Sequence, residues 1–181
     1  ALDQIFTFWT TLPGKTAFEK INELPPAHYM LISPHSIKTD KYWNMNFLKN
    51  KEIINRKTND LAEEISATLM DAVKIRLRAD VAVGSYLSGG LDSSAITETV
   101  KKNFNNELRS FGIRFENKNY DEGSFQNEMV DFLGVQHSDI LVGNDDIGAN
   151  LENVLWHTEK PLLRTGPIPL FLLSKLVHQS G

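Results

Sequence analysis

Stretches with a helical repeat of apolar residues alternate with short apolar runs along residues 56–181, and this alternation predicts helices and strands in turn. A helix is expected to begin with Asn59 as its N-cap residue. An apolar run over 80–87 then has the character of a buried parallel strand, and residues 94–104 have helical composition. The first helix carries one apolar stripe that should pack on a sheet, formed by Leu61, Ile65, Leu69, Val73 and Leu77.

The alternation continues toward the carboxyl end, where Gly134 is expected to close a helix. The elements expected there are strands over 108–115 and 137–142 and helices over 121–134, 145–158 and 167–178. Strands that alternate with helices form a parallel sheet whose two faces are both covered by helices. The fold class that the pattern predicts for this part is therefore α/β.

The first third of the chain has a different character. Residues 1–33 have the pattern of short strands and a helical turn: "DQIFTFWT" alternates like a strand, "PGKTAFEKINEL" suits a turn and short helix, and "AHYMLIS" is extended. Residues 36–59 are polar and rich in Lys and Asn, which suits a linker. We therefore expect two parts, 1–55 and 56–181.

Composition limits the classes of function. The chain has 181 residues, 41% of them hydrophobic, which is enough for one good core and a fragment of another. A net charge of -4 gives no general attraction for nucleic acid or acidic membranes, so neither is expected as a partner. No stretch is long enough to span a bilayer, and a cytoplasmic protein is expected. The chain has no cysteine, which excludes disulfides and a cysteine nucleophile within it.

The stretch "SGGLDSS", residues 88–94, lies between an expected strand and an expected helix. Ligands of open parallel sheets bind at such places, where a helix presents its unpaired N–H groups. Gly89 and Gly90 would let successive main-chain amides converge on phosphate oxygens. Hydroxyl donors could come from three serines, Ser88, Ser93 and Ser94.

Asp92 would repel a phosphate unless a cation lies between them. Mg²⁺ favours one or two carboxylates together with phosphate oxygens, so Asp92 makes sense as its ligand. Two plainer interpretations remain open. The glycines can form a simple turn while Asp92 or Ser93 caps the helix, or the domain can be a sheet without any ligand.

"SGGLDSS" also resembles the pyrophosphate loop of the ATP pyrophosphatases. Within that group the chain is similar to glutamine-hydrolysing asparagine synthetase in three ordered blocks: "FTFWTTLPGKTAFEKINELPPAHYML", "SFGIRFENKNYDEGSFQNEMVDFLGVQH" and "HTEKPLLRTGPIPLFLLSKLV". The resemblance covers nearly the whole chain. It implies an adenine nucleotide alpha hydrolase-like sheet over 56–181, the first part of a synthetase domain, preceded by a short α+β remnant of a glutamine amidotransferase domain and its linker over 1–55.

The resemblance also implies an activity. In this family a glutaminase domain releases ammonia from glutamine, and a synthetase domain uses MgATP to convert aspartate to β-aspartyl-AMP, from which ammonia displaces AMP. The substrates implied are thus aspartate, ATP and ammonia or glutamine, and a homo-oligomer stays open. By position, the pyrophosphate and its metal would be held by Ser88, Gly89, Gly90, Asp92, Ser93 and Ser94.

Four further residues receive roles from the resemblance. Leu87 and Ile113 would flank the adenine, although both also suit plain core packing. Glu159 and Arg164 would line the aspartate or adenylate side, although a surface ion pair is equally compatible with their sequence.

Two departures from the family limit the implied activity. The family's glutaminase needs an amino-terminal cysteine, whereas this chain begins with Ala1, so its first part is expected not to hydrolyse glutamine. The family's second loop, Ser-Gly-x-Gly-x-Asp-Glu, is absent, and the terminal "HQSG" fits the end of a helix better. The segment alone is therefore expected to be a partial nucleotide site. A β-lactam-forming synthetase, another adenylating amidotransferase and a non-catalytic nucleotide-binding module remain alternatives.

Overall fold

A computed structural model describes residues 1–47, 56–104 and 107–181 of the chain. Its contacts divide the chain into two units. The first comprises Ala1–Asn55 and Leu155–Arg164, and the second comprises Arg56–Val154 and Thr165–Gly181. Within the described residues, no helix combines the length and apolar character needed to cross a membrane.

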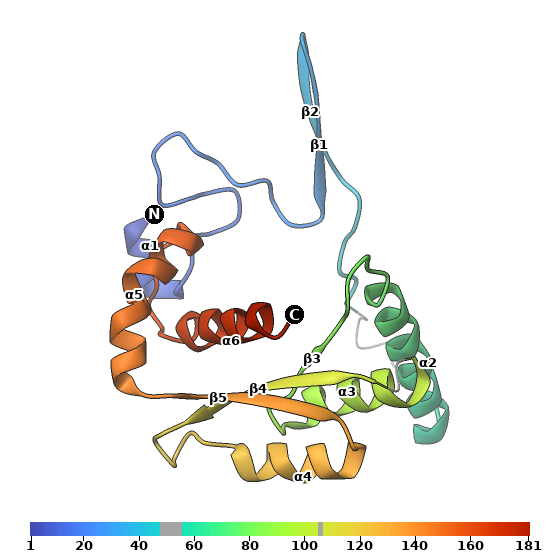
Figure 1. Cartoon of the computed structure of the whole chain (residues 1–181). Coiled ribbons are helices and arrows are strands. Elements are labelled where there is room, and N and C mark those ends of the chain that lie inside the picture. The colour runs from blue at the N-terminus through green and yellow to red at the C-terminus, as the bar shows by residue number, and fades with distance from the viewer. Residues whose placement is uncertain (48–55, 105–106) are drawn as a thin grey trace. The chain divides into compact units, whose positions relative to one another are not determined.

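The second unit is built on a three-stranded parallel sheet in the order β3-β4-β5 (Figure 1). The strands are β3 (Ser85–Tyr86), β4 (Arg109–Phe115) and β5 (Gln136–Val142). Seven consecutive pairs, from Arg109 with Gln136 to Phe115 with Val142, join β4 to β5. The parallel sheet that the sequence predicts is confirmed.

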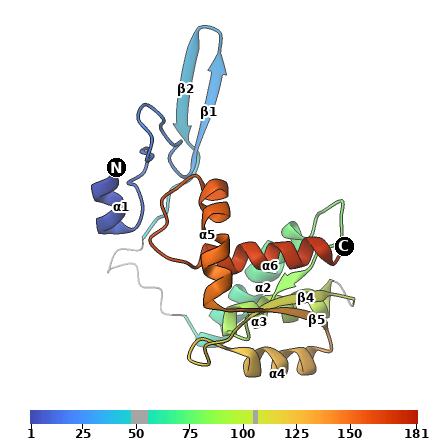
Figure 2. The same ribbon diagram turned by 60° about the vertical axis from the view of Figure 1, so that its left-hand side comes forward.

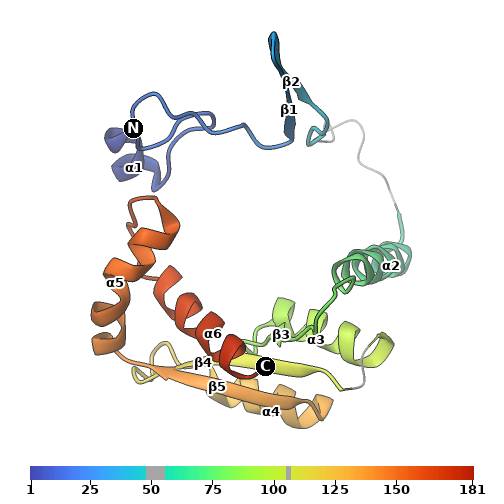
Figure 3. The same cartoon turned by 45° about the horizontal axis from the view of Figure 1, so that its top comes forward.

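Helices cover both faces of this sheet. The connections between consecutive strands are α3 (Leu91–Asn103) and α4 (Gly123–Leu133), which lie on one face, and α6 (Pro167–Gln179) crosses the other (Figure 3). The inner side of α6 is apolar, with Ile168, Leu172 and Leu173 all buried. The sheet therefore has the covered α/β architecture expected from the alternating pattern.

Helix α2 (Thr58–Arg76) uses only part of its apolar stripe. Its carboxyl-terminal half joins a core cluster through Val73, with Leu69 and Leu77 packed alongside. In its amino-terminal half Leu61 is 41% exposed and Ile65 is 67% exposed. The expectation that the stripe packs on a sheet was wrong for this half, because α2 packs against α3 rather than along a strand. The other members of the cluster are Val100, Leu108, Leu133 and Val135.

Several boundaries differ from those predicted. Helix α2 begins at Thr58 with Lys57 as its N-cap residue, not Asn59. The ladder of β3 covers two residues rather than 80–87, because the segment ahead of it is exposed, with Val81 at 77%. Helix α3 begins at Leu91, three residues earlier than expected. The remaining helices agree closely: α4 ends at Gly134, whose φ is 59°, and α5 spans Asn144–Thr158.

The first unit holds a short helix and a hairpin. Helix α1 spans Leu2–Phe8, where "DQIFTFWT" predicted a strand. That expectation was wrong, because the alternating apolar positions do not share a buried face: of the helical residues, Ile5 is buried. Strands β1 (His28–Ser33) and β2 (Ser36–Lys41) pair antiparallel, as Figure 2 shows. The first of these confirms the extended "AHYMLIS".

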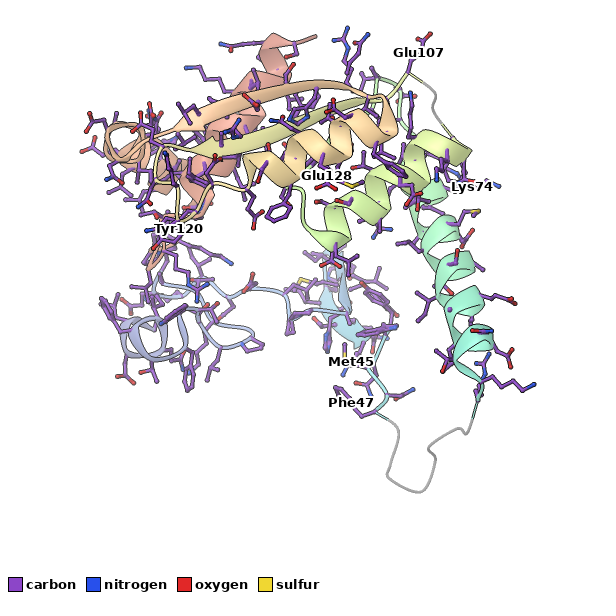
Figure 4. The ribbon with its side chains drawn as sticks, turned by 90° about the horizontal axis from the view of Figure 1, so that it is seen from below. Met45, Phe47, Lys74, Glu107, Tyr120 and Glu128 are labelled. Carbon is purple, nitrogen blue, oxygen red and sulfur yellow. The ribbon has the colours of Figure 1, made fainter. Side chains whose placement is uncertain are left out.

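The predicted linker over 36–59 was wrong at its start, because pairing with β1 makes Ser36–Lys41 a strand. The stretch 48–55 of that linker lies outside the described residues. The "PGKTAFEKINEL" stretch forms turns without the expected short helix. Beyond β2, Met45 and Phe47 are exposed (Figure 4).

Candidate nucleotide site

The "SGGLDSS" stretch forms a tight loop between the last paired residue of the β3 segment and the first turn of α3. Gly89 adopts a φ of +83°, a conformation that side chains disfavour. A Cβ atom at this position would lie 2.6 Å from the main-chain nitrogen of Gln126 and 2.7 Å from the carbonyl carbon of Phe125. Only glycine therefore lets this loop approach α4 so closely.

Serine hydroxyls close the loop on itself. The Ser88 N–H donates to Ser93 Oγ at 3.2 Å, and Ser93 Oγ donates to the Gly90 carbonyl at 3.1 Å. The two hydroxyls lie 3.0 Å apart, and the Gly90 N–H donates to Ser88 Oγ at 3.3 Å. These bonds hold the loop in shape before any ligand arrives.

The amino end of α3 makes the loop suitable for binding an anion. Gly90 is the N-cap residue, and the first N–H groups of a helix have no partner within it. Together with the positive end of the helix dipole, they favour an anion such as phosphate. Among the described residues, Ser94 Oγ is buried at this end without a hydrogen-bond partner.

Asp92 is exposed in the first turn of α3. Within the described ranges, no group of three or more His, Cys, Asp or Glu side chains could hold a metal ion. A single carboxylate beside an anion-binding loop suits Mg²⁺, which takes one or two carboxylates and completes its shell with phosphate oxygens and water. The donor set thus fits a metal that arrives with a polyphosphate.

A cavity of about 250 Å³ lies next to the loop. It brings together four of the predicted site residues, Leu87, Ser88, Ser93 and Ile113. Leu87 is 1% exposed and lies where β3 ends. The other lining residues come from β3, β4, the β4–α4 turn and two helices: Tyr86, Phe111, Gly112, Phe115, Tyr120, Glu122, Gln126, Leu170 and Leu173.

The cavity follows the edge of β4 that β3 leaves uncovered. The Leu87 N–H donates to the Phe111 carbonyl at 2.8 Å, so Ile113 and Phe115 present their main-chain groups to the same edge farther along. Where β3 no longer pairs with β4, side chains form the hydrogen bonds to this edge. Gln126 Nε2 donates to the Ile113 carbonyl at 2.7 Å, and the Phe115 N–H donates to Asp121 Oδ1 at 3.2 Å.

An ion pair fixes the turn that forms the rim of the cavity. Asp121 accepts two hydrogen bonds of 2.8 Å from the Arg114 guanidinium. These bonds lower the pKa of Asp121 to about 2, and the pairing raises the pKa of Arg114. Tyr120 and Glu122, on either side of Asp121, line the cavity; Tyr120 is labelled in Figure 4.

Gln126 was not among the site residues predicted from the sequence. It is 1% exposed and lies one helical turn before Met129 and Val130 on the apolar side of α4. A glutamine on such a stripe signals a buried polar contact, but only the fold shows with which strand. The feature of the sequence that could have identified Tyr120, Asp121 and Glu122 is their position in the turn that follows a strand.

Glu159 and Arg164 belong to the first unit. The Arg164 guanidinium carbon lies 3.8 Å from the ring centroid of Trp9. Glu159 has a φ of 52° and lines a cavity of about 740 Å³ together with Phe18 and Trp156. Their predicted role beside the aspartate or the adenylate stays a prediction.

Comparison with known proteins adds an independent finding. Residues 64–181, well over half of the chain, match the family described as asparagine synthase. Glutamine-hydrolyzing asparagine synthetase 1 of Bacillus subtilis is 29% identical over 175 residues, which are 97% of this chain and 27% of that protein. The putative glutamine-hydrolyzing asparagine synthetase 2 of Methanocaldococcus jannaschii is 33% identical over 140 residues, 77% of this chain and 27% of that protein.

A relative with a different name is also similar. Amidase chyE of Penicillium rubens is 26% identical over 185 residues, covering 94% of this chain and 28% of that protein. The chain thus spans about a quarter of the length of these curated relatives. The match over 64–181, together with the parallel sheet and its loop, shows that the chain belongs to the asparagine synthase family.

Proposed function

We propose that the whole protein is an ATP-dependent ligase that converts aspartate to asparagine through β-aspartyl-AMP, with ammonia released from glutamine. This chain contributes the site for the nucleotide. The observation that carries the proposal is the glycine loop at Gly89, held by serine hydroxyls at the amino end of α3 and opening beside the cavity lined by Leu87 and Ile113. Family membership supports the ligase type of chemistry.

The proposed reaction has two balanced steps. A side-chain carboxylate oxygen of aspartate attacks the α-phosphorus of ATP and pyrophosphate leaves, which forms a mixed anhydride. Ammonia then attacks the carbonyl carbon, AMP leaves, and a proton is lost from nitrogen. The first step builds negative charge on the departing pyrophosphate, and fixed dipoles aimed at that charge lower the barrier.

The chain's residues meet that need in distinct places. The main-chain N–H groups of Gly89 and Gly90 and the first turn of α3 would bind pyrophosphate oxygens. Ser94 Oγ would find a hydrogen-bond partner there. Leu87 and Ile113 would flank the adenine ring. Asp92 would hold Mg²⁺ against the phosphates, and that ion would neutralise charge on the leaving group.

The two parts of the chain expected from the sequence suit different parts of such an enzyme. We assign residues 1–55 to the end of a glutamine amidotransferase domain and its linker, and 56–181 to the start of the synthetase domain. The alignment with the Bacillus subtilis synthetase covers 97% of this chain and so extends over most of its first 55 residues, which supports the first assignment. Glu159 and Arg164 are retained as candidates for contacts with aspartate or the adenylate.

A second candidate keeps the adenylation and changes the acceptor. Relatives named amidases, such as Amidase chyE, are about as similar to this chain as those named asparagine synthetases. Their name differs from that of the synthetases, so the acceptor of the adenylation is left to experiment. Product analysis of the full-length protein with aspartate, MgATP and ammonium decides between the two, because asparagine and AMP form in equal amounts only in the first case.

Isothermal titration of the 181-residue chain with ATP, with and without Mg²⁺, tests the nucleotide site. We expect binding that strengthens with Mg²⁺, and we expect Asp92→Ala to abolish this strengthening. Asp71→Ala, on the exposed face of α2, is the matched control and should behave as the unaltered chain. Absence of both ATP and pyrophosphate binding would contradict the proposal.

A further inference from the structure

A small polar cluster lies in the interior of the second unit, between α4 and the sheet. Gln126 and Ser110 are each 1% exposed, and His137 is half-buried beside them. Within the part of the chain that the structure describes, Gln126 Oε1 and His137 Nε2 are buried without a hydrogen-bond partner. Buried polar atoms without partners are rare in folded proteins, so each calls for an explanation.

The two atoms converge on one point above Gly112. A Cβ atom on Gly112 would lie 2.7 Å from Gln126 Oε1 and 3.0 Å from His137 Nε2. Gly112 thus leaves the space in which the two side chains face each other. Neither atom has a hydrogen-bond partner among the residues that the structure describes, so the Gln126 side chain is held by the bond that its nitrogen makes.

Neighbouring hydrogen bonds fix the direction of this contact. Gln126 Nε2 donates to the Ile113 carbonyl at 2.7 Å, so the carbonyl oxygen of its side chain faces away from the strand edge. Ser110 Oγ lies 2.9 Å from His137 Nδ1. Burial lowers the pKa of His137, so the ring is neutral at pH 7.

We propose that Gln126 is a positioning residue of the nucleotide pocket. Its side-chain nitrogen donates to the Ile113 carbonyl, while its side-chain oxygen lies beside the His137 ring above Gly112. That carbonyl lies on the edge of β4 that β3 leaves uncovered, beside the predicted adenine site. This hydrogen bond therefore holds the wall against which the base packs, whereas the serine and glycine loop holds the phosphates. This inference rests on the proposed nucleotide site.

The adenine end and the phosphate end of the pocket can be tested separately with two ligands. In Gln126→Leu the Ile113 carbonyl loses its donor, and we expect the affinity for ATP to fall about tenfold. Inorganic pyrophosphate binds only at the loop, so its affinity should stay unchanged. A purely structural defect would weaken both ligands, and that result would overturn the positioning role, as would unchanged affinity for both.

Gln179→Leu provides the matched control, since Gln179 is exposed at the end of α6. It should bind ATP and pyrophosphate as the unaltered chain does. If the unaltered chain binds pyrophosphate and not ATP, the proposed nucleotide site fails whatever Gln126 does. The two failures are thus distinguishable.

Discussion

Replacing Gly89 with alanine tests whether the loop's shape depends on close contact with α4. Two costs combine in this variant. The φ of +83° is disfavoured for alanine by about 1 to 2 kcal/mol. The added methyl would also lie 2.6 Å and 2.7 Å from main-chain atoms of Gln126 and Phe125, which cannot move aside as a flexible side chain could.

Forcing a methyl group into such a packed position costs about 1 to 3 kcal/mol. The expected loss of unfolding free energy for Gly89→Ala is therefore about 2 to 5 kcal/mol. The shift needed to relieve the contact would also separate the loop from α4. We therefore expect pyrophosphate binding to be lost together with stability.

Gly134→Ala is the matched control for the backbone conformation. Gly134 also has a positive φ, 59°, but a Cβ atom there would meet nothing within 4 Å. It should cost only the conformational part, about 1 to 2 kcal/mol, and leave pyrophosphate binding unchanged. Urea denaturation followed by circular dichroism gives both free energies. Equal destabilisation by the two variants would refute the contact argument.

Four other variants test separate parts of the second unit. Arg114 lowers the pKa of Asp121 from 3.8 to about 2, so the pair stabilises the fold above pH 3.8 and this contribution is lost as the pH falls toward 2. Asp121→Asn should therefore be less stable than the unaltered chain at pH 7. In acid denaturation it should lose less stability between pH 3.8 and 2. Leu108 is 1% exposed, and Leu108→Ala should lower the free energy of unfolding by about 2 to 5 kcal/mol in urea denaturation. Leu61 is 41% exposed, and Leu61→Ala should lower it by less than about 0.5 kcal/mol. Similar losses would contradict the exposure of Leu61 in the amino-terminal half of α2. Gly148→Ala, in open space within α5, should raise the melting temperature, because alanine favours helix by about 0.5 to 1 kcal/mol; a lowered value would contradict this.

The fold of the second unit could be predicted because its signals are local. Gly134 closes α4 as expected, since a left-handed residue after an apolar repeat is a short-range feature. The boundaries of β3 could not be predicted in this way. Residues 80–84 have the composition of a strand, but only pairing with β4 decides how far the ladder extends. For the same reason Ser36–Lys41 resembles a linker until β1 lies beside it.

The candidate site likewise contains residues that the sequence predicts and residues that only the fold brings to the site. Leu87, Ser88, Ser93 and Ile113 were predicted and line one cavity, because strand ends of a parallel sheet meet at one edge. Gln126 could not be placed, because its partner Ile113 lies on a different element and nothing in their spacing links them. The roles of Glu159 and Arg164 rest on the family resemblance alone.

A ¹H–¹⁵N NMR titration of the chain with MgATP tests the nucleotide site residue by residue. We expect amide shifts to change first at Gly89, Gly90 and the first turn of α3, and then at Ile113. Pyrophosphate should move the loop signals and leave that of Ile113 in place. Shift changes confined to other parts of the chain, or none at millimolar ATP, would contradict the claim that this loop and the adjoining edge of β4 bind the nucleotide.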